Sequence, residues 1–378
     1  MLMTLIVFIV ILSVLVLVHE FGHFIVAKKL GIRVEEFGLG IPPRIFGKKI
    51  GETIYSLNWL PFGGFVKVTG EDPQELEGAV VNDPRSFISR SPGQRAAVLC
   101  AGVFMNIIMA ALLFYVVLGA NGFRTQYIPL IFDHKFKLGE TQTLGVVVSG
   151  MLDNSSAQKS GIQVGDAILT VDGISVQNVV DLRNSLKGKL GKDVEVKLMD
   201  IRDDYAGPTR TLMVKPQVDD KGNVILGVYI TKAVSLGYTK PWEKYFAGFL
   251  HSYNVLDFSI STFAHLIGIS YAEKSIAPVS ESVAGPVGIY QLIGGLISYG
   301  GKKVVFRLLD FVALMSISLA FVNILPLPAL DGGRVLFVVI EKLRGKPVSA
   351  TFEATLHKWG YIALLLLLVL ITIKDTLR

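Results

Sequence analysis

The first apolar run constrains this chain more than any other stretch, because residues 1–18 contain only one threonine and one serine among apolar side chains. A run of this length and polarity predicts a helix that crosses a membrane. It passes directly into His19-Glu20-Phe21-Gly22-His23, and Lys28 and Lys29 follow a few residues later. A helix rises about 1.5 Å per residue, so His23 would lie roughly 8 Å from Lys28, inside the membrane but close to one face.

The spacing of the two histidines suits a metal site. On a helix, His19 and His23 lie on one face and can share an ion, and Glu20 between them is placed as a general base. Short matches of this kind also arise by chance on the surfaces of soluble helices. Here, however, three ionisable groups would lie in a bilayer, where they are costly unless they are paired or functional. The metal site is therefore the favoured interpretation.

The composition fits a membrane protein that carries a soluble insert. Of 378 residues, 51% are hydrophobic and 18% are charged, and the mean hydropathy is +0.53. Cys100 is the single cysteine, so no disulfide framework is expected. The net charge of +6 gives no reason to expect a nucleic-acid partner.

Three further apolar runs predict three more spans, at residues 96–120, 308–325 and 359–373. Lysine and arginine are frequent in segments 28–95 and 334–358 beside these runs, and the positive-inside rule places both segments in the cytoplasm. Four spans follow, with both termini and the insert 121–303 on the outer side. No Lys or Arg lies before Lys28, so the chain lacks the basic first region of a signal peptide, and we expect a retained span.

The first cytoplasmic segment contains a stretch that alternates apolar and polar residues. Residues 54–68 alternate around Pro61, Gly63 and Gly64, which predicts short strands with tight turns at the membrane surface beneath the histidines. An exposed strand edge there can pair with an unwound substrate by β-augmentation. A hairpin with a purely structural role is an equally good interpretation.

The second span contains Gly102-Val103-Phe104-Met105-Asn106. A glycine on a membrane helix usually allows close helix packing. Asn106 needs a partner, because an amide in hydrocarbon is otherwise unsatisfied. It can bond a neighbouring helix, or it can donate to an oxygen anion near the metal. Packing is the favoured role when this span is considered alone.

The insert contains glycines at regular turn positions between short β-branched runs, as in Gly161-Ile162-Gln163-Val164-Gly165-Asp166. The continuation to Gly173 resembles a PDZ domain, which would occupy residues 143–232, with a helix at 179–190 and strands at 194–199 and 211–214. This resemblance implies that the backbone amides of Leu144, Gly145 and Val146 receive a peptide C-terminus. A folded spacer with an unused groove is the alternative.

Apolar residues recur at helical spacing over 242–267, which predicts an amphipathic helix on the outer membrane face or packed on the spans. His251, His265 and Asp257 on this stretch are interpreted as interfacial polar residues rather than metal ligands. Gly285-Pro286-Val287-Gly288-Ile289 then breaks the pattern and is a candidate lining for an access path.

The third span ends in Asn323-Ile324-Leu325-Pro326-Leu327-Pro328-Ala329-Leu330-Asp331-Gly332-Gly333. Its prolines interrupt helical hydrogen bonding, so this backbone must line a cavity or be buried in protein. Asp331 reaches the same membrane face as His23. It can cap a helix that begins at Gly332, but a catalytic zinc bound by two histidines needs a third protein ligand, and Asp331 is the best-placed carboxylate.

Taken together, these motifs resemble the site-2 protease family of intramembrane zinc proteases, in its bacterial branch related to the regulator-of-sigma-E protease. The resemblance covers nearly the whole chain. It implies that His19, His23 and Asp331 hold Zn²⁺, that Glu20 is the general base, and that Asn106 and Asn323 position substrate or stabilise the oxyanion. One PDZ domain is expected here, whereas some relatives have two.

The expected fold is a polytopic α-helical membrane protein with four transmembrane helices and an inserted α+β PDZ domain. Its parts are 1–142 and 304–378 as the two halves of the protease core, 143–232 as the PDZ domain and 233–303 as a membrane-surface and substrate-access region. The resemblance implies cleavage of single-span membrane proteins, such as an anti-sigma factor or signal peptide remnants, in the bacterial inner membrane. The rival is a catalytically silent membrane scaffold, which predicts no metal and indifference to Glu20.

Overall fold

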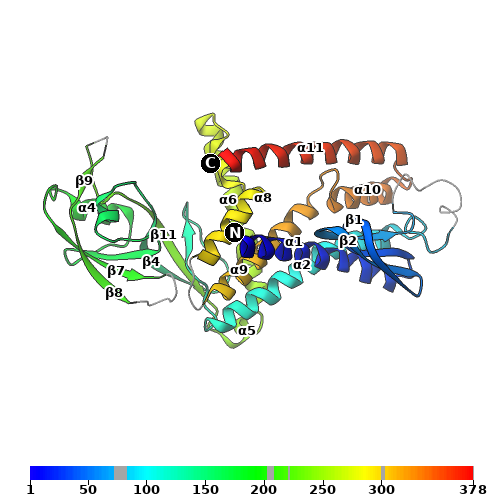
Figure 1. The fold of residues 1–378 in the computed structure, drawn as a ribbon, viewed down its shortest axis with the longest axis horizontal. Coiled ribbons are helices and arrows are strands. Elements are labelled where there is room, and N and C mark those ends of the chain that lie inside the picture. Colours follow the sequence, from blue (N-terminus) through cyan, green and yellow to red (C-terminus); the bar gives the residue numbers. More distant parts are fainter. Residues whose placement is uncertain (72–82, 202–207, 220–221, 299–302, 378) are drawn as a thin grey trace. The chain divides into compact units, whose positions relative to one another are not determined.

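The computed structural model describes residues 1–71, 83–201, 208–219, 222–298 and 303–377 (Figure 1). Contacts between residues divide the chain into two compact units. The first holds Met1–Phe114, Leu266–Gly300 and Val304–Arg378, and the second holds Tyr115–His265. The second unit therefore begins within the second apolar run, earlier than the expected PDZ boundary at 143.

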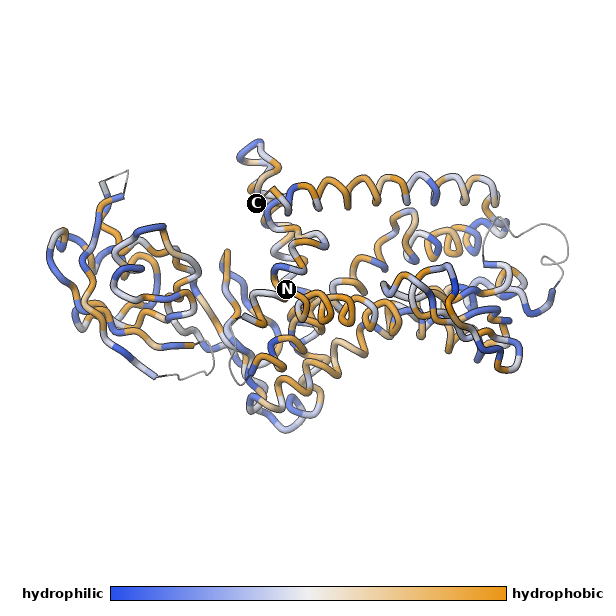
Figure 2. Tube along the Cα trace, viewed as in Figure 1, coloured by the Kyte–Doolittle hydropathy of each residue, from blue (hydrophilic) through white to orange (hydrophobic). Residues whose placement is uncertain are grey.

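Long apolar helices make up most of the first unit. They are α1 (Leu2–Lys29), α2 (Pro92–Ala120), α9 (Val304–Ile324) and α11 (Ala350–Leu377), and apolar residues follow one another along all of them (Figure 2). Each of the four predicted spans coincides with part of one of these helices to within one residue at its ends. The same unit contains the shorter helices α7 (Ala277–Ser282), α8 (Pro286–Ser298) and α10 (Asp331–Arg344).

A further helix, α6 (Ala247–Glu273), is also long and apolar enough to cross a membrane, judged by its length and composition alone. The single helix expected over 242–267 is wrong in its bounds, because α5 (Pro241–Tyr245) ends with Phe246 as its C-cap and α6 begins at Ala247. Residues 247–273 carry only Asp257 and Glu273 as charged side chains. A helix with so few charged residues can either cross a membrane or lie on its surface. The spacing of its apolar residues therefore could not distinguish a transmembrane helix from a surface helix.

Helix α2 runs antiparallel to α1 and contacts it closely. The backbone carbonyl of Val98 lies by His23, while Asn106, two turns further along α2, lies by His19. At Gly22 an added Cβ would come within 2.3 Å of the Ala101 carbonyl oxygen. Only glycine allows the two helices to approach this closely.

Helix α9 runs parallel to α1. Phe8, Ile11 and Leu15 of α1 share an apolar core with side chains from Leu308 to Leu319 of α9 and with Ile293 of α8. The chain leaves α9 after Ile324 and reaches Asp331 beside His19. The C-terminal part of α1, which contains His19, and the C-terminal end of α9, which leads to Asp331, therefore lie on the same side of the bundle.

The first loop folds into an antiparallel sheet of β1 (Val34–Ile50) and β2 (Thr53–Val68). Both strands bend back, so that Glu36 pairs with Ile54 on one side and with Lys67 on the other. Strands were predicted correctly for 54–68, but Pro61, Gly63 and Gly64 lie within β2 rather than at turns, because bulges in the register absorb them.

Two contacts mark the position of this sheet along α1. Ser13 Oγ donates to the Pro61 carbonyl oxygen at 2.6 Å, and an added Cβ on Gly63 would lie 3.3 Å from a Val16 methyl group. These contacts reach well into the apolar part of α1. This part of the sheet therefore lies alongside the helix, on the N-terminal side of His19.

The second unit contains a sheet in the strand order β3-β11-β4-β5-β7-β8, with β6 paired to β5. Its bounds are β3 (Ile128–Leu130), β4 (Glu140–Met151), β5 (Asp166–Val171), β6 (Ile174–Ser175), β7 (Val194–Asp200), β8 (Thr209–Val214) and β11 (Val228–Gly237). A small pair, β9 (Gln217–Val218) with β10 (Val224–Ile225), and helices α3 (Ser156–Lys159) and α4 (Val179–Leu186) complete it. We call residues 140–237 the PDZ-like domain.

The core of the PDZ-like domain comes from the inward residues of the strands and from α4. Val146, Ile168, Val196 and Leu198 of the strands pack with Leu182 of α4, and all are buried. The strands expected at 194–199 and 211–214 are present. The expected helix at 179–190 ends earlier, at Leu186, because Gly188 adopts a positive φ of 71° that terminates it.

Candidate metal centre and active site

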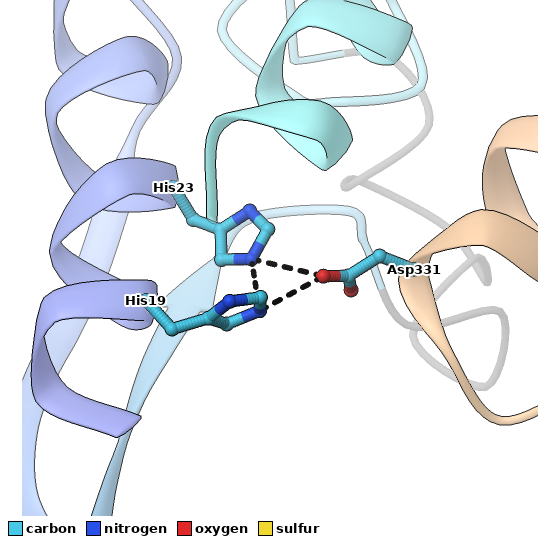
Figure 3. A group of neighbouring side chains, drawn as sticks. All are labelled: His19, His23 and Asp331. Carbon is cyan, nitrogen blue, oxygen red and sulfur yellow. Dashed lines mark hydrogen bonds and ion pairs between the residues drawn. The ribbon is translucent and has the colours of Figure 1, made fainter. Parts of the chain in front are cut away.

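Three side chains from distant parts of the chain converge near the C-terminal part of α1 (Figure 3). His19 Nε2 lies 2.9 Å from Asp331 Oδ2, His23 Nε2 lies 3.4 Å from the same oxygen, and the two Nε2 atoms are 3.2 Å apart. Both histidines are buried. Among the described residues, this is the one group of three or more metal-ligating side chains brought within reach of a common ion.

The group fits zinc in donor set and in spacing. Zinc takes imidazole nitrogen and carboxylate oxygen at about 2.0–2.2 Å, so ligand atoms at tetrahedral corners lie roughly 3.3 Å from one another. The three separations, from 2.9 to 3.4 Å, match this value. Three protein ligands also leave a fourth position for water or substrate, as catalytic zinc sites require.

Helix α2 shapes the face of the site behind the histidines. Gly102 lies directly against both rings, because an added Cβ would come within 2.4 Å of His23 Nε2 and 2.6 Å of His19 Cε1. His23 Nδ1 donates to the Val98 carbonyl oxygen at 2.8 Å. A carbonyl only accepts hydrogen bonds, so this contact places the proton of a neutral His23 on Nδ1 and leaves Nε2 free to bind a metal.

The segment before α10 brings Asp331 to the histidines. Leu330 is the N-cap of α10, and Asp331 is its first residue, so the carboxylate is turned towards the histidines instead of capping the helix. An added Cβ on Gly332 would lie 2.3 Å from the Leu325 carbonyl oxygen, and one on Gly333 would lie 2.2 Å from that of Leu327. The two glycines let α10 begin directly against the proline-containing loop, which explains why they follow Asp331.

Glu20 lies beside this group rather than in it. Its Oε2 accepts a hydrogen bond from the backbone N–H of Val66 on β2 at 3.1 Å. Glu20 borders a cavity of about 440 Å³ that is also lined by Arg334, His357 and Lys358. It borders a second cavity, of about 220 Å³, between α1 and α9. The carboxylate is therefore reached from two sides, as a group that moves protons during a reaction should be.

The two asparagines predicted as site residues have different surroundings. Asn323 is half-buried and lines the smaller cavity together with His19, Glu20 and Asp331. Asn106 is completely buried behind His19, where its Nδ2 lies 3.2 Å from His19 Nδ1. Only Asn323 borders a space that a substrate can occupy.

Several neighbouring residues were missed by the sequence analysis. His357 Nδ1 accepts from the backbone N–H of Ala329, whose φ of 72° is unusual for a residue other than glycine. Arg334 forms an ion pair with Glu71, and burial raises the pKa of Glu71 although Arg334 acts in the opposite direction. Arg334 directly follows Asp331-Gly332-Gly333 in the sequence. Glu71 and His357 belong to no recognisable sequence pattern.

The polar residues His251, Asp257 and His265 contact other side chains of the second unit. His251 Nδ1 bonds the Tyr238 hydroxyl at 3.1 Å, Asp257 pairs with Lys137 at 2.7 Å, and His265 stacks on Phe132. The metal-ligating group found among the described residues consists of His19, His23 and Asp331 and includes none of these three.

Of the three residues expected to receive a peptide C-terminus, Leu144, Gly145 and Val146, the last has strand neighbours on both sides. Val146 pairs with Lys232 of β11 on one side and with Ile168 of β5 on the other. A peptide cannot add a strand where the backbone already has neighbours on both sides. The sequence showed the strand but not its neighbours.

With the site described, the chain can be compared with known proteins. The model of peptidase family M50 matches residues 7–367. The chain belongs to peptidase family M50. A protein of Clostridium perfringens that carries a zinc-metalloprotease name is 34% identical over 366 residues, which cover 96% of this chain and 95% of that protein. Zinc metalloprotease RasP of Bacillus licheniformis is 28% identical, and the match covers 99% of each chain.

A solved PDZ domain of Listeria monocytogenes aligns with 23% of this chain at 20% identity and a TM-score of 0.20, a likeness too low to assign the inserted domain. Membership of M50, the site-2 protease family, makes the chain a membrane zinc metalloprotease. It also decides against the catalytically silent scaffold.

Proposed function

We propose that this M50 peptidase hydrolyses peptide bonds within the transmembrane segments of single-span membrane proteins. In this proposal His19, His23 and Asp331 hold zinc and Glu20 is the general base. One observation carries it: three ligand atoms lie within 4.8 Å of one another, beside a carboxylate that borders two cavities. Anti-sigma factors and signal peptide remnants are the expected kinds of substrate.

The chemistry that zinc supplies when bound is activation of a water molecule and polarisation of the scissile carbonyl. Glu20 accepts the proton of that water and later delivers it to the leaving amine. The Val66 N–H holds one oxygen of Glu20 and leaves the other for the proton. Asn323, on the smaller cavity, is proposed to donate its amide N–H to the oxygen on which negative charge develops.

A substrate helix must unwind before its carbonyls are accessible, because they are bonded within the helix. The edge of β2 near Val66 is proposed to receive the unwound strand by β-augmentation. The hydrogen bond from Val66 to Glu20 is the supporting contact, since it means that this edge faces the catalytic carboxylate. A strand paired there would pass directly by the site.

We propose four spans, with both termini and the PDZ-like domain outside. Helices α1 and α9 run in the same direction and α2 runs against them, so the chain must begin α9 on the side where α2 ends. The segment between them therefore crosses the membrane an even number of times. If α6 crossed, α8 would have to return, but its 13 residues span only about 20 Å of a bilayer core about 30 Å thick.

Two variants test the catalytic proposal on purified protein in detergent, with zinc content and cleavage of a model transmembrane substrate as readouts. Glu20→Gln should abolish cleavage and keep zinc, because the amide cannot accept the proton. Asp331→Ala should lose both, because one of three ligands is removed. Zinc loss in Glu20→Gln, or full zinc content and turnover in Asp331→Ala, would refute the assigned roles.

A further inference from the structure

One polar side chain of α2 lies against the outer nitrogen of a proposed zinc ligand. Asn106 is fully buried, and its amide lies 3.2 Å from His19 Nδ1, on the far side of the ring from Asp331. The other amide atom, Oδ1, is buried and has no hydrogen-bond partner among the described residues. A buried carbonyl oxygen without a donor is costly, so its position calls for an explanation.

The chemistry of His19 supplies the explanation. If Nε2 binds the metal, a neutral imidazole carries its proton on Nδ1, and that N–H needs an acceptor. A half-turn of the Asn106 amide exchanges Oδ1 and Nδ2, which have nearly the same shape. The orphan oxygen then accepts from His19 Nδ1–H at the separation that the amide already has.

The other histidine is held in the same way from the same helix face. Val98, Gly102 and Asn106 follow one another at intervals of four residues on α2, and therefore lie along one face. The Val98 carbonyl accepts from His23 Nδ1, Gly102 leaves room for both rings, and Asn106 reaches His19. Each histidine thus has its outer nitrogen next to one polar group of α2, and after the exchange of Oδ1 and Nδ2 both of these groups are acceptors.

The Asn106 backbone is itself fixed. Its carbonyl oxygen accepts from Ser316 Oγ of α9 at 2.8 Å. Because Asn106 lies behind the ring and has no exposed surface, its amide does not face the cavities that Glu20 and Asn323 border.

We propose that Asn106 is a positioning residue that accepts a hydrogen bond from His19 Nδ1–H, fixes the tautomer of this zinc ligand and so raises zinc affinity. This role replaces direct action on the substrate or the oxyanion. The inference rests on the proposed function, in which His19 is a ligand. Under this inference Asn106 acts on the metal site, and Asn323 is the asparagine whose amide faces the substrate.

Zinc affinity tests the proposal directly, by competition with a chelator on the purified full chain in detergent. Asn106→Ala removes the acceptor and should weaken zinc binding by about 10- to 100-fold. Asn106→Asp keeps an acceptor of the same size and should stay within a few-fold of the parent. Ser316→Ala is the matched control for packing, since it alters the neighbouring contact and leaves the amide in place.

Activity at rising free zinc separates this role from the alternatives. Asn106→Ala should regain the parent plateau of cleavage once zinc saturates it, at a zinc concentration 10- to 100-fold higher. An oxyanion donor would instead give unchanged zinc affinity and a lowered plateau, and a purely structural residue would give a loss that neither zinc nor Asn106→Asp restores. Either outcome overturns the proposal.

His19→Ala distinguishes failure of this inference from failure of the proposed function. If His19→Ala keeps parent zinc affinity, then His19 is not a ligand and the proposed site is wrong. If His19→Ala loses zinc while Asn106→Ala binds it as the parent does, the site stands and only the role of Asn106 falls.

Discussion

The backbone N–H of Val66 donates to the Glu20 carboxylate at 3.1 Å, so a strand of the first loop holds the catalytic base proposed for α1. The two residues are 46 positions apart. A hydrogen bond from a rigid strand restricts the rotamers of Glu20. It thereby limits which oxygen can accept a proton.

Val66→Pro should slow cleavage roughly tenfold or more, part of the 10²–10⁴-fold that a positioned general base contributes. Proline removes the N–H without removing the strand, and an edge position tolerates it. Val66→Ala keeps the N–H and serves as the control. Turnover of a model substrate is the measurement, with zinc content expected to be unchanged in both. Equal turnover in the two variants would mean that this hydrogen bond has no part in catalysis.

Gly102→Ala should reduce zinc affinity, because the new Cβ would come within 2.4 Å of His23 Nε2. Overpacking of this kind costs about 1–3 kcal/mol, which corresponds to roughly 5- to 150-fold in affinity. Gly119→Ala on the same helix is the matched control, since nothing lies within 4 Å of its added Cβ. Competition with a chelator compares the two. If both variants bind zinc equally well, α2 does not lie against the ligands as described.

His357→Phe should weaken zinc binding and cleavage together, because the partly buried N–H of Ala329 loses the acceptor that holds the loop before Asp331. An unsatisfied buried donor costs about 1–3 kcal/mol. His357→Asn offers an oxygen near the position of Nδ1 and should restore much of the loss. Ala329→Gly keeps the N–H and relieves the positive φ of 72°, so we expect it to remain active. Failure of the asparagine variant to improve on phenylalanine would argue against the hydrogen bond.

The proposed sidedness can be tested with single cysteines, after replacing Cys100, the only one in the chain. Exposed positions Lys48 and Lys346 should be protected from a membrane-impermeant maleimide in intact cells, and Asp153 should react. Lys274, just after α6, decides the number of spans. It should react like Asp153. Protection at Lys274 would mean that α6 crosses the membrane and that four spans are too few.

Local sequence was sufficient to locate the four long helices of the first unit and to choose the residues that converge at the candidate metal site. His19, Glu20 and His23 are close in sequence, so helical geometry alone relates them, and Asp331 follows a span that had to end at the same face. Val66, Glu71 and His357 could not be found in this way, because their partners are fixed by tertiary packing of segments with no shared motif. The same limit applies at Val146, since alternation predicts a strand but does not name the two strands that pair with it.

His19 and Asp331, which are 312 positions apart, also set the moment at which the site can form. The first helix leaves the ribosome early, while the third ligand is made only near the end of synthesis. At about 5–20 residues per second, the interval between them is roughly 15–60 s. During that time the growing chain carries the two histidines and the glutamate but lacks a complete binding site. A newly made chain therefore cannot complete the proposed zinc site until translation is almost finished.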